Sequence, residues 1–240
     1  MTAAPSRLSW IRIAAESAAI VASILLAFAI DAWWQERSDR KAELVLLERL
    51  RADYIEIQAS LRIVKEEHRK ARSACVYLLD MAIGDLLPAT TEVDRMVAVV
   101  FLTSRTFNPG SGAVASFISS DGAQLLRNQL LADKLLAWSS LVEELQEEEA
   151  NLQKGVAERW SPYIAARVSI GPYLATFDEM HGMPSQISTP STRVPLAVDE
   201  EFLNHVLDRF KWQQIALRDI EPVSSVIADI LALIEKELSR

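Results

Sequence analysis

Apolar and small residues recur in alternating steps of three and four from residue 47 to residue 82. Such spacing places the residues along one face of a helix as a continuous seam. The seam consists of Leu47, Leu50, Tyr54, Ile57, Leu61, Val64, His68, Ala71, Cys75, Leu78 and Ala82. No Pro or Gly stands between Trp34 and Gly84, so we expect one long helix, broken near residues 84–88. The seam could pack on a second chain, but its polar or small members His68, Ala71 and Cys75 suit a long two-stranded coiled coil less well than packing on later helices of the same chain.

Two further helices are predicted downstream. The first begins at Thr91, with Thr91 as the cap and Asp94 as its reciprocal partner, and it ends before the turn at residues 108–112. A short helical turn at 113–118 and a break with Asp121 as cap precede the next helix. The apolar face of that helix carries Leu131, Leu135, Trp138, Val142, Leu145, Leu152 and Val156.

Residues 171–197 contain Pro and Gly among Ser and Thr, which predicts a long irregular loop. The acidic residues Asp199, Glu200 and Glu201 then indicate a helix start. Its apolar face is expected to carry Phe202, Val206, Phe210 and Leu217. Pro222 is expected to interrupt this helix, and a second stripe follows at Val223, Ile227, Ile230, Ile234 and Leu238. The patterns together predict an all-α fold with an antiparallel bundle of four to five helices in residues 35–240.

Composition agrees with this prediction and narrows the function. The 240 residues include only seven Gly and nine Pro, and 50% are hydrophobic, as expected of a mainly helical chain with a sizeable core. The formal net charge of −8 provides no positive field for phosphates, so nucleic acid is excluded as a partner. The single Cys75 cannot form an internal disulfide and is interpreted as a small buried apolar residue.

An apolar stretch at residues 13–34 predicts a transmembrane anchor after an N-terminal tail of residues 1–12. At ~1.5 Å per residue it measures about 33 Å, enough to cross a bilayer core. Trp10 lies at one end and Trp33 and Trp34 at the other, where aromatic rings prefer the membrane interfaces. The anchor therefore predicts a single-pass protein with the membrane as a partner.

A cleavable signal peptide is the alternative to an uncut signal-anchor. Arg7 and Arg12 would be its positive region, and Ala27-Phe28-Ala29 has the form of a cleavage site. The helical pattern continues without Gly or Pro through Trp34, which favours the uncut anchor. Positive residues flank both ends of the span, and the short basic tail favours a cytoplasmic N-terminus, with the bulk of the chain periplasmic or otherwise extracytoplasmic.

Two stretches carry a resemblance to a known family. Residues 19–37 end in Asp-Ala-Trp-Trp-Gln-Glu-Arg, and residues 117–130 read Phe-Ile-Ser-Ser-Asp-Gly-Ala-Gln-Leu-Leu-Arg-Asn-Gln-Leu. In both the chain resembles a family of uncharacterised bacterial membrane proteins with an N-terminal anchor helix and a helical soluble domain. The resemblance implies a location in the bacterial inner membrane. It implies no activity and transfers no functional residue.

The sequence contains no recognisable catalytic motif. Glycine-rich nucleotide loops and the Gly-x-Ser-x-Gly nucleophile motif are both absent, and His68, His181 and His205 do not form a triad pattern. Glu201 and His205 could share a helix face, but a surface pair explains them better than a metal site. Met180, His181 and Met183 would suit a soft metal, yet three such residues do not define a site. We therefore assign no catalytic, cofactor-binding or metal-binding residue.

The remaining charged and aromatic groups are interpreted as structural. The acidic run Glu143, Glu144, Glu147, Glu148 and Glu149 is expected to be a solvated helix face rather than a cation-binding patch. Trp138, Trp160 and Trp212 are expected to anchor the core.

Three function classes follow. The first is a membrane-anchored helical interaction, scaffold or accessory module that binds a protein partner or forms a homo-oligomer. The second is a ligand-sensing helical bundle that relays through a partner protein. An unfamiliar enzyme is the third.

Overall fold

The computed structural model describes residues 7–82, 86–110, 112, 114, 117, 125–173, 175 and 195–240. Its α-helices are α1 (Arg7–Met81), α2 (Thr91–Leu102), α5 (Gln129–Gly155), α6 (Ser161–Arg167) and α8 (Glu200–Leu238), and the π-helix η1 (Val156–Trp160) joins α5 to α6. Strands β1 (Leu86–Leu87) and β2 (Leu196–Ala197) form a short antiparallel pair in which Leu87 faces Leu196. The prediction of an all-α fold is confirmed.

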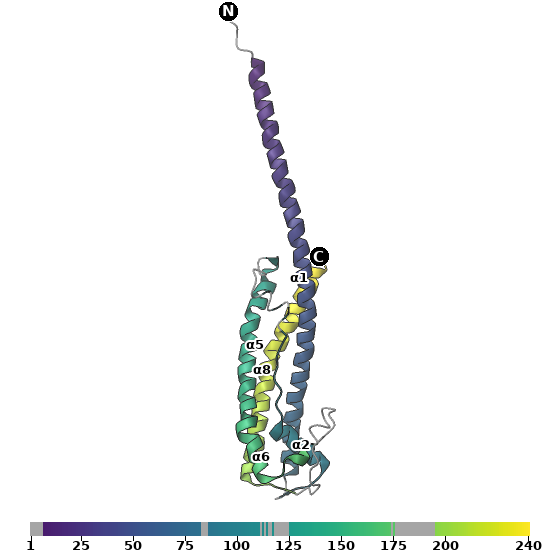
Figure 1. Ribbon diagram of the computed structural model, residues 1–240, viewed down its shortest axis with the longest axis vertical. Helices are drawn as coiled ribbons and strands as arrows, with labels where there is room; N and C mark the ends of the chain where they lie inside the picture. Colours follow the sequence, from purple (N-terminus) through teal and green to yellow (C-terminus); the bar gives the residue numbers. More distant parts are fainter. Residues whose placement is uncertain are drawn as a thin grey trace, which may run out of the picture.

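Helix α1 is a single rod of 75 residues whose first half stands clear of the rest of the molecule (Figure 1). Residues 12–39 are all exposed, and an 18-residue window of this half has a mean hydropathy of 2.2 with none of it buried. The helix is thus long and apolar enough to cross a membrane, as predicted for residues 13–34. It ends at Met81, which confirms the predicted break after one continuous helix.

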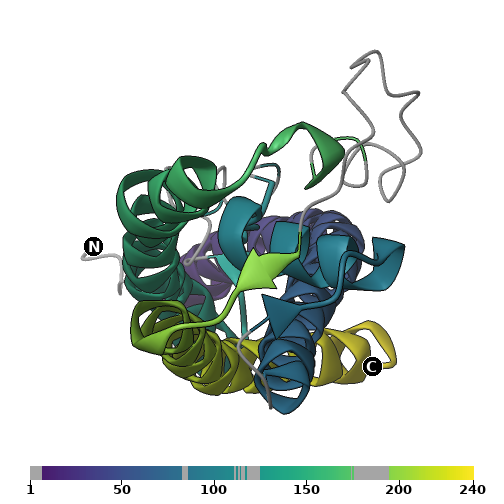
Figure 2. The same ribbon diagram turned by 90° about the horizontal axis from the view of Figure 1, so that it is seen from below.

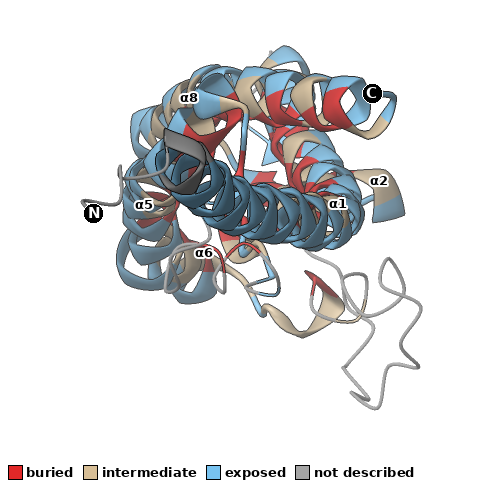
Figure 3. Ribbon diagram, turned by 90° about the horizontal axis from the view of Figure 1, so that it is seen from above, coloured by how far each residue is buried: buried red, intermediate tan, exposed pale blue. Residues whose placement is uncertain are grey.

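The second half of α1 packs on α8, α5 also packs on α8, and α8 runs antiparallel to both (Figures 1 and 2). Helices α2 and α6 lie at the end of the bundle farthest from the N-terminus (Figure 1). All ten seam residues from Leu47 to Leu78 are buried, and Ala82 is half-buried. Figure 3 shows the buried residues facing the interior of the bundle, while the protruding half of α1 is exposed throughout. The seam is therefore used within the chain, as its polar or small members indicated.

The bundle contains two apolar clusters along its length. The cluster nearer the anchor joins residues 47–64 of α1, the first half of α5 and the last part of α8, with Tyr54 and Trp138 in an edge-to-face contact at 5.3 Å between ring centroids. The distal cluster joins the end of α1, α2, α6 and the start of α8, and it includes Trp160, Cys75 and the strand residues Leu87 and Leu196. Trp212 packs half-buried against this second cluster. The prediction of aromatic core anchors therefore holds for Trp138 and Trp160 and in part for Trp212.

Two predicted helix features are wrong. The cap of α2 is Thr90, whose hydroxyl accepts the Val93 N–H at 3.2 Å, and Thr91 is the first helical residue. Adjacent threonines give the same local signal, and the extended backbone of Thr90 selects the earlier one. Pro222 does not interrupt α8, which continues through it to Leu238. Pro222 is on the exposed face, so packing of the buried face on both sides holds the helix together despite one missing hydrogen bond.

The predictions for the remaining segments are confirmed in part. The helical turn at 113–118 falls mostly outside the described residues, as does the proposed cap Asp121, and α5 begins at Gln129 with Asn128 as its cap. Of the predicted loop at 171–197, residues 171–173 and 175 are helical and 196–197 form β2. The predicted start of α8 is confirmed, since the Asp199 carboxylate accepts the Phe202 N–H at 2.8 Å.

Candidate functional site

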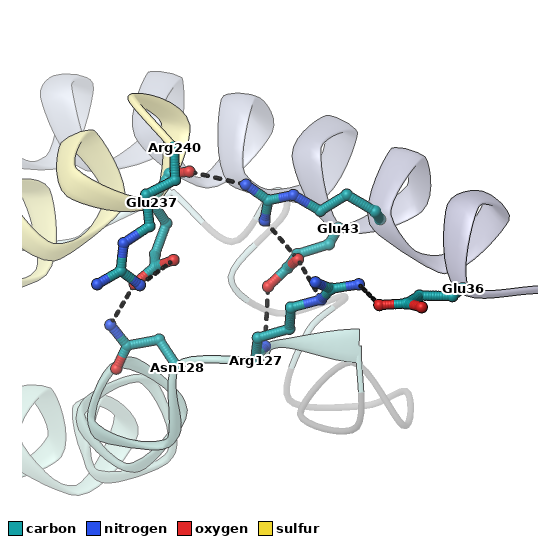
Figure 4. A network of polar contacts seen from close by, with 7 residues as sticks. Glu36, Glu43, Arg127, Asn128, Glu237 and Arg240 are labelled. Atoms are coloured by element: carbon teal, nitrogen blue, oxygen red, sulfur yellow. Dashed lines mark hydrogen bonds and ion pairs between the residues drawn. The ribbon is translucent and has the colours of Figure 1, made fainter. Parts of the chain in front are cut away.

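A network of polar side chains lies at the end of the bundle from which the exposed half of α1 extends (Figure 4). We call the seven residues concerned the junction network; they are Glu36, Arg40, Glu43, Arg127, Asn128, Glu237 and Arg240. Glu43 is 1% exposed and accepts the Arg127 backbone N–H at 2.8 Å and an Arg40 N–H at 2.6 Å. Arg40 also donates to the Glu237 carbonyl at 3.0 Å. Groups from α1, from the start of α5 and from the end of α8 therefore meet at one point.

Glu237 is the second buried carboxylate of the junction network. It accepts from Asn128 at 2.8 Å and from Arg240 at 2.8 and 3.0 Å. Burial raises the pKa of Glu237, but the hydrogen bonds and the nearby arginines lower it more, so its pKa lies below the usual value. The ionised carboxylate thus holds the C-terminal end of α8 against the cap of α5. Since α1 is one continuous helix, the junction fixes the bundle to the anchor.

The exposed half of α1 has the features of a membrane helix at both ends. Arg12 pairs with Glu16 at 3.2 Å, so the acidic group in the apolar stretch carries its own counter-charge. Trp33 and Trp34 are 58% and 67% exposed at the other end, and the Arg37 guanidinium lies over the Trp33 ring at 5.9 Å. In the middle of this half, the Ser23 hydroxyl donates a hydrogen bond to the Ala19 carbonyl at 2.7 Å. The hydroxyl therefore has a hydrogen-bond partner that is not water.

A buried polar layer separates the two apolar clusters. His68 of α1, Glu149 of α5, and Arg209 and Gln213 of α8 are each at most 2% exposed. His68 and Glu149 each lie between buried apolar residues of their own helix, and Arg209 and Gln213 together lie between the buried Val206 and Ala216. The expectation that the acidic run is wholly solvated is therefore wrong for Glu149. This carboxylate accepts the Phe107 N–H, and Gln146 donates to the Phe107 carbonyl at 3.1 Å, so the non-helical segment 103–110 is held along α5.

Arg209 is the buried cation of this layer. Its guanidinium donates to the Thr103 carbonyl through Nη2 and lies over the Trp160 ring at 4.7 Å. Trp160 ends the π-helix η1, and its ring packs onto Gly155, where an added Cβ would lie only 2.7 Å from ring atoms. Glycine is therefore required for this close approach. Burial lowers the pKa of Arg209 to about 10, which leaves the side chain charged at neutral pH.

Gln213 connects Arg209 to His68. In the amide orientation that satisfies both partners, the Gln213 nitrogen donates to His68 Nδ1 at 2.7 Å and its oxygen accepts from Arg209 Nε at 3.2 Å. His68 then carries its proton on Nε2, which faces Glu149 Oε1 at 3.6 Å. The layer is a chain of groups from α8 through α1 to α5.

A cavity of about 270 Å³ opens beside this layer. Its walls come from α1, from the end of α2, from residues 103–105 and from α8. Arg209 and Gln213 form the inner wall, and Glu67 and Arg105 are charged residues of the lining. Three of the lining residues have a buried polar atom that makes no hydrogen bond within the described structure: His68 Nε2, Ser104 Oγ and Arg209 Nη1. Polar atoms without partners therefore lie within the wall of this cavity rather than on its accessible surface.

Of the candidate residues from the sequence, the described pair Glu201 and His205 does not form a metal site. Glu201 is paired with Arg167 at 2.5 Å, and the His205 ring packs on Tyr163 with centroids 4.1 Å apart. Burial lowers the pKa of His205, which keeps the ring neutral near pH 7. Met180, His181 and Met183 lie outside the described residues. Within the described ranges, no group of three or more His, Cys, Asp or Glu side chains could hold a metal ion.

The described structure thus defines a class: a helical bundle that continues directly from one exposed apolar helix and contains a buried polar layer beside a cavity. Comparison with family models, with curated proteins and with solved structures finds no match.

Proposed function

We propose that this chain is a membrane-anchored, non-enzymatic accessory module whose bundle is held on a single membrane helix and which works by joining another membrane protein or a second copy of itself. The continuity of α1 carries this proposal. Its second half forms the core of the bundle, and its first half is apolar and fully exposed. The seam of the second half is covered within the bundle, whereas the apolar surface of the first half is uncovered and available to a partner helix.

Small residues recur along one side of the apolar half of α1. Ala15, Ala19, Ser23 and Ala27 follow one another every four residues, and Leu26 also lies on this side, seven residues after Ala19. Large apolar side chains occupy the opposite side at Val21, Leu25 and Phe28, which are 55%, 62% and 67% exposed. Small residues at such spacing allow two membrane helices to approach closely, whereas large apolar residues suit lipid. The small face is therefore the proposed contact with a partner helix.

Crosslinking in membranes tests the contact. Ala19→Cys is compared with the matched control Val21→Cys on the opposite face; the native Cys75 is buried and stays unreactive. Oxidation to a disulfide detects a second copy, and coupling to a photoreactive maleimide detects a different protein. We expect a defined crosslinked band from Ala19→Cys and none from Val21→Cys. Equal crosslinking from both positions, or monomer alone from both, would contradict the proposal.

The orientation is part of the same proposal. The short tail with Arg7 and Arg12 is placed in the cytoplasm and the bundle outside it, at a bacterial inner membrane, in line with the resemblance noted in the sequence. Alkaline phosphatase and green fluorescent protein fused separately to Arg240 test this. An active phosphatase with a dark fluorescent fusion at full length is expected. The reverse pair of results would place the bundle in the cytoplasm, and a shortened soluble product would identify residues 1–29 as a signal peptide.

A ligand-sensing bundle is the second candidate function, and the cavity beside Arg209 favours it. The cavity lies between α1 and α8, the two helices that the junction network ties together. Occupancy there would bear directly on the helix that enters the membrane. Such a sensor would require a partner protein for its output.

A further inference from the structure

The guanidinium of Arg209 is buried and charged, and its Nη1 donor has no hydrogen-bond partner among the described residues. The side chain is 1% exposed, and no carboxylate of the described residues lies within 4.0 Å of it. Glu149 is on the far side of His68 and is occupied by the Phe107 N–H. A cation held in a protein interior is costly unless an anion or hydrogen-bond acceptors offset the lost hydration. Thr103, Gln213 and the Trp160 ring supply part of this, and Nη1 stays without an acceptor.

The other residues of the cavity lining indicate which kind of ligand would fit next to Arg209. Ser104 Oγ adds a second buried polar atom without a partner, and Arg105 adds positive charge to the lining. The acidic lining residue Glu67 is neutralised by Lys70 at 2.9 Å. The apolar residues of the lining are Ala71, Val99 and Leu102, and His68, Thr103 and Gln213 complete it. The lining therefore combines positive, hydrogen-bonding residues with apolar ones.

We infer that this cavity binds a small organic acid, whose carboxylate draws the buried Arg209 Nη1 and Ser104 Oγ toward the cavity as hydrogen-bond donors and whose short apolar chain lies against Ala71, Val99 and Leu102. Arginine presents its N–H groups in a planar arrangement that suits a carboxylate. The volume of about 270 Å³ is below the ~300–1,000 Å³ of pockets for drug-sized ligands, so a molecule of a few carbons is the right size. An inorganic oxyanion would satisfy Arg209 but would leave the apolar residues of the lining uncovered. The inference rests on the cavity alone, independently of the helix contact that crosslinking tests.

Calorimetric titration of the full chain in detergent micelles tests the ligand class. The probes are butyrate, the neutral isostere butyramide, and inorganic phosphate and sulfate, all at constant ionic strength. We expect saturable binding of butyrate and at least tenfold weaker binding of butyramide. Equal binding of butyrate and butyramide overturns the role of the carboxylate. Saturation by phosphate or sulfate with none by butyrate overturns the organic acid, and no saturation by any probe up to about 10 mM overturns the site.

Two variants locate the binding. Ala71→Leu adds volume to the cavity wall without replacing a member of the polar layer, and Arg209→Lys keeps the charge but removes the planar donor pair. Lys134→Gln, which changes a surface ion pair with Asp229 on another part of the bundle, is the control. We expect at least tenfold weaker butyrate binding in the first two and unchanged binding in the third. Cooperative thermal unfolding shows which variants are folded, and wild-type affinity in a folded Ala71→Leu variant would refute the assignment.

Discussion

Removal of the Glu43 carboxylate should loosen the junction between anchor and bundle. In Glu43→Ala, the Arg127 backbone N–H loses the acceptor that lies 2.8 Å away, and Arg40 loses its partner at 2.6 Å. A hydrogen bond to a charged group contributes ~1.5–3 kcal/mol. The Arg40 and Arg127 side chains are 24% and 51% exposed and can be rehydrated, so their ion pairs add at most ~1 kcal/mol. The expected loss of unfolding free energy is therefore about 3 kcal/mol.

Thermal unfolding of the full chain in detergent measures this loss. For a chain of this size ~1 kcal/mol corresponds to ~2–4 °C, so Tm should fall by about 6–12 °C. Tryptophan fluorescence follows the transition, because the buried Trp138 and Trp160 become exposed on unfolding, whereas Trp33 and Trp34 are already exposed in the folded chain.

Glu36→Ala is the matched control. Glu36 also reaches Arg127, at 3.5 Å, but it is 70% exposed, so its loss should change the unfolding free energy by less than ~1 kcal/mol. A Glu43→Ala Tm within about 2 °C of the wild type, or an equal effect of Glu36→Ala, would refute the reasoning that burial makes the Glu43 contact strong.

Three other predictions concern the bundle. Pro222→Ala should raise Tm by several degrees in the same assay, because Pro in a helix interior costs up to ~3 kcal/mol relative to Ala; an unchanged Tm would mean that α8 already accommodates the ring. The pKa of Glu237 is below its usual value, since Asn128 and Arg240 outweigh burial. The stabilising effect of this carboxylate is therefore complete above the unfolded pKa of about 4.3 and is lost as pH falls through the folded pKa. Glu237→Gln should flatten the decline of Tm below about pH 5. Burial raises the pKa of Cys75 to about 12, so iodoacetamide at pH 8 should modify it only at the rate of unfolding, and rapid labelling of the folded chain would contradict this.

The long elements could be predicted because their spacing directly reports burial. All ten seam positions from Leu47 to Leu78 are buried, and the predicted face of α5 from Leu131 to Leu152 is buried as well. A regular alternation of three and four residues has one structural solution when a helix packs on other helices. That the first half of α1 is long and apolar enough to cross a membrane follows from the sequence in the same way.

The polar layer could not be predicted from apolar spacing because its members are charged or polar residues in apolar positions. Arg209 and Gln213 continue the steps from Val206 to Ala216, but the sequence interpretation followed the apolar Phe210 and Leu217, which are only half-buried. Glu149 was likewise assigned to a solvated face with its acidic neighbours. The signal was present, since each of these residues falls at a seam position. Recognising it requires a buried partner at the same level on another helix, and pairing between helices is set by the tertiary fold.

The local ends of helices depended on equally small differences. Thr90 and Thr91 are both good caps, and only the backbone conformation distinguishes them. The Pro222 prediction failed for the opposite reason, because a strong local preference was outweighed by packing along the whole of α8.

The polar layer fixes the register of the helices, and this affects which variants can test ligand binding in the cavity. Two apolar clusters of similar helices could pack in more than one register, whereas buried polar groups at one level, His68, Glu149, Arg209 and Gln213, match in only one. The layer therefore fixes which residues surround the cavity and which groups meet at the junction, whether or not a ligand binds. A change to Arg209 alone alters both register and binding. Ala71→Leu separates the two, because it adds volume to the cavity wall and replaces no member of the layer.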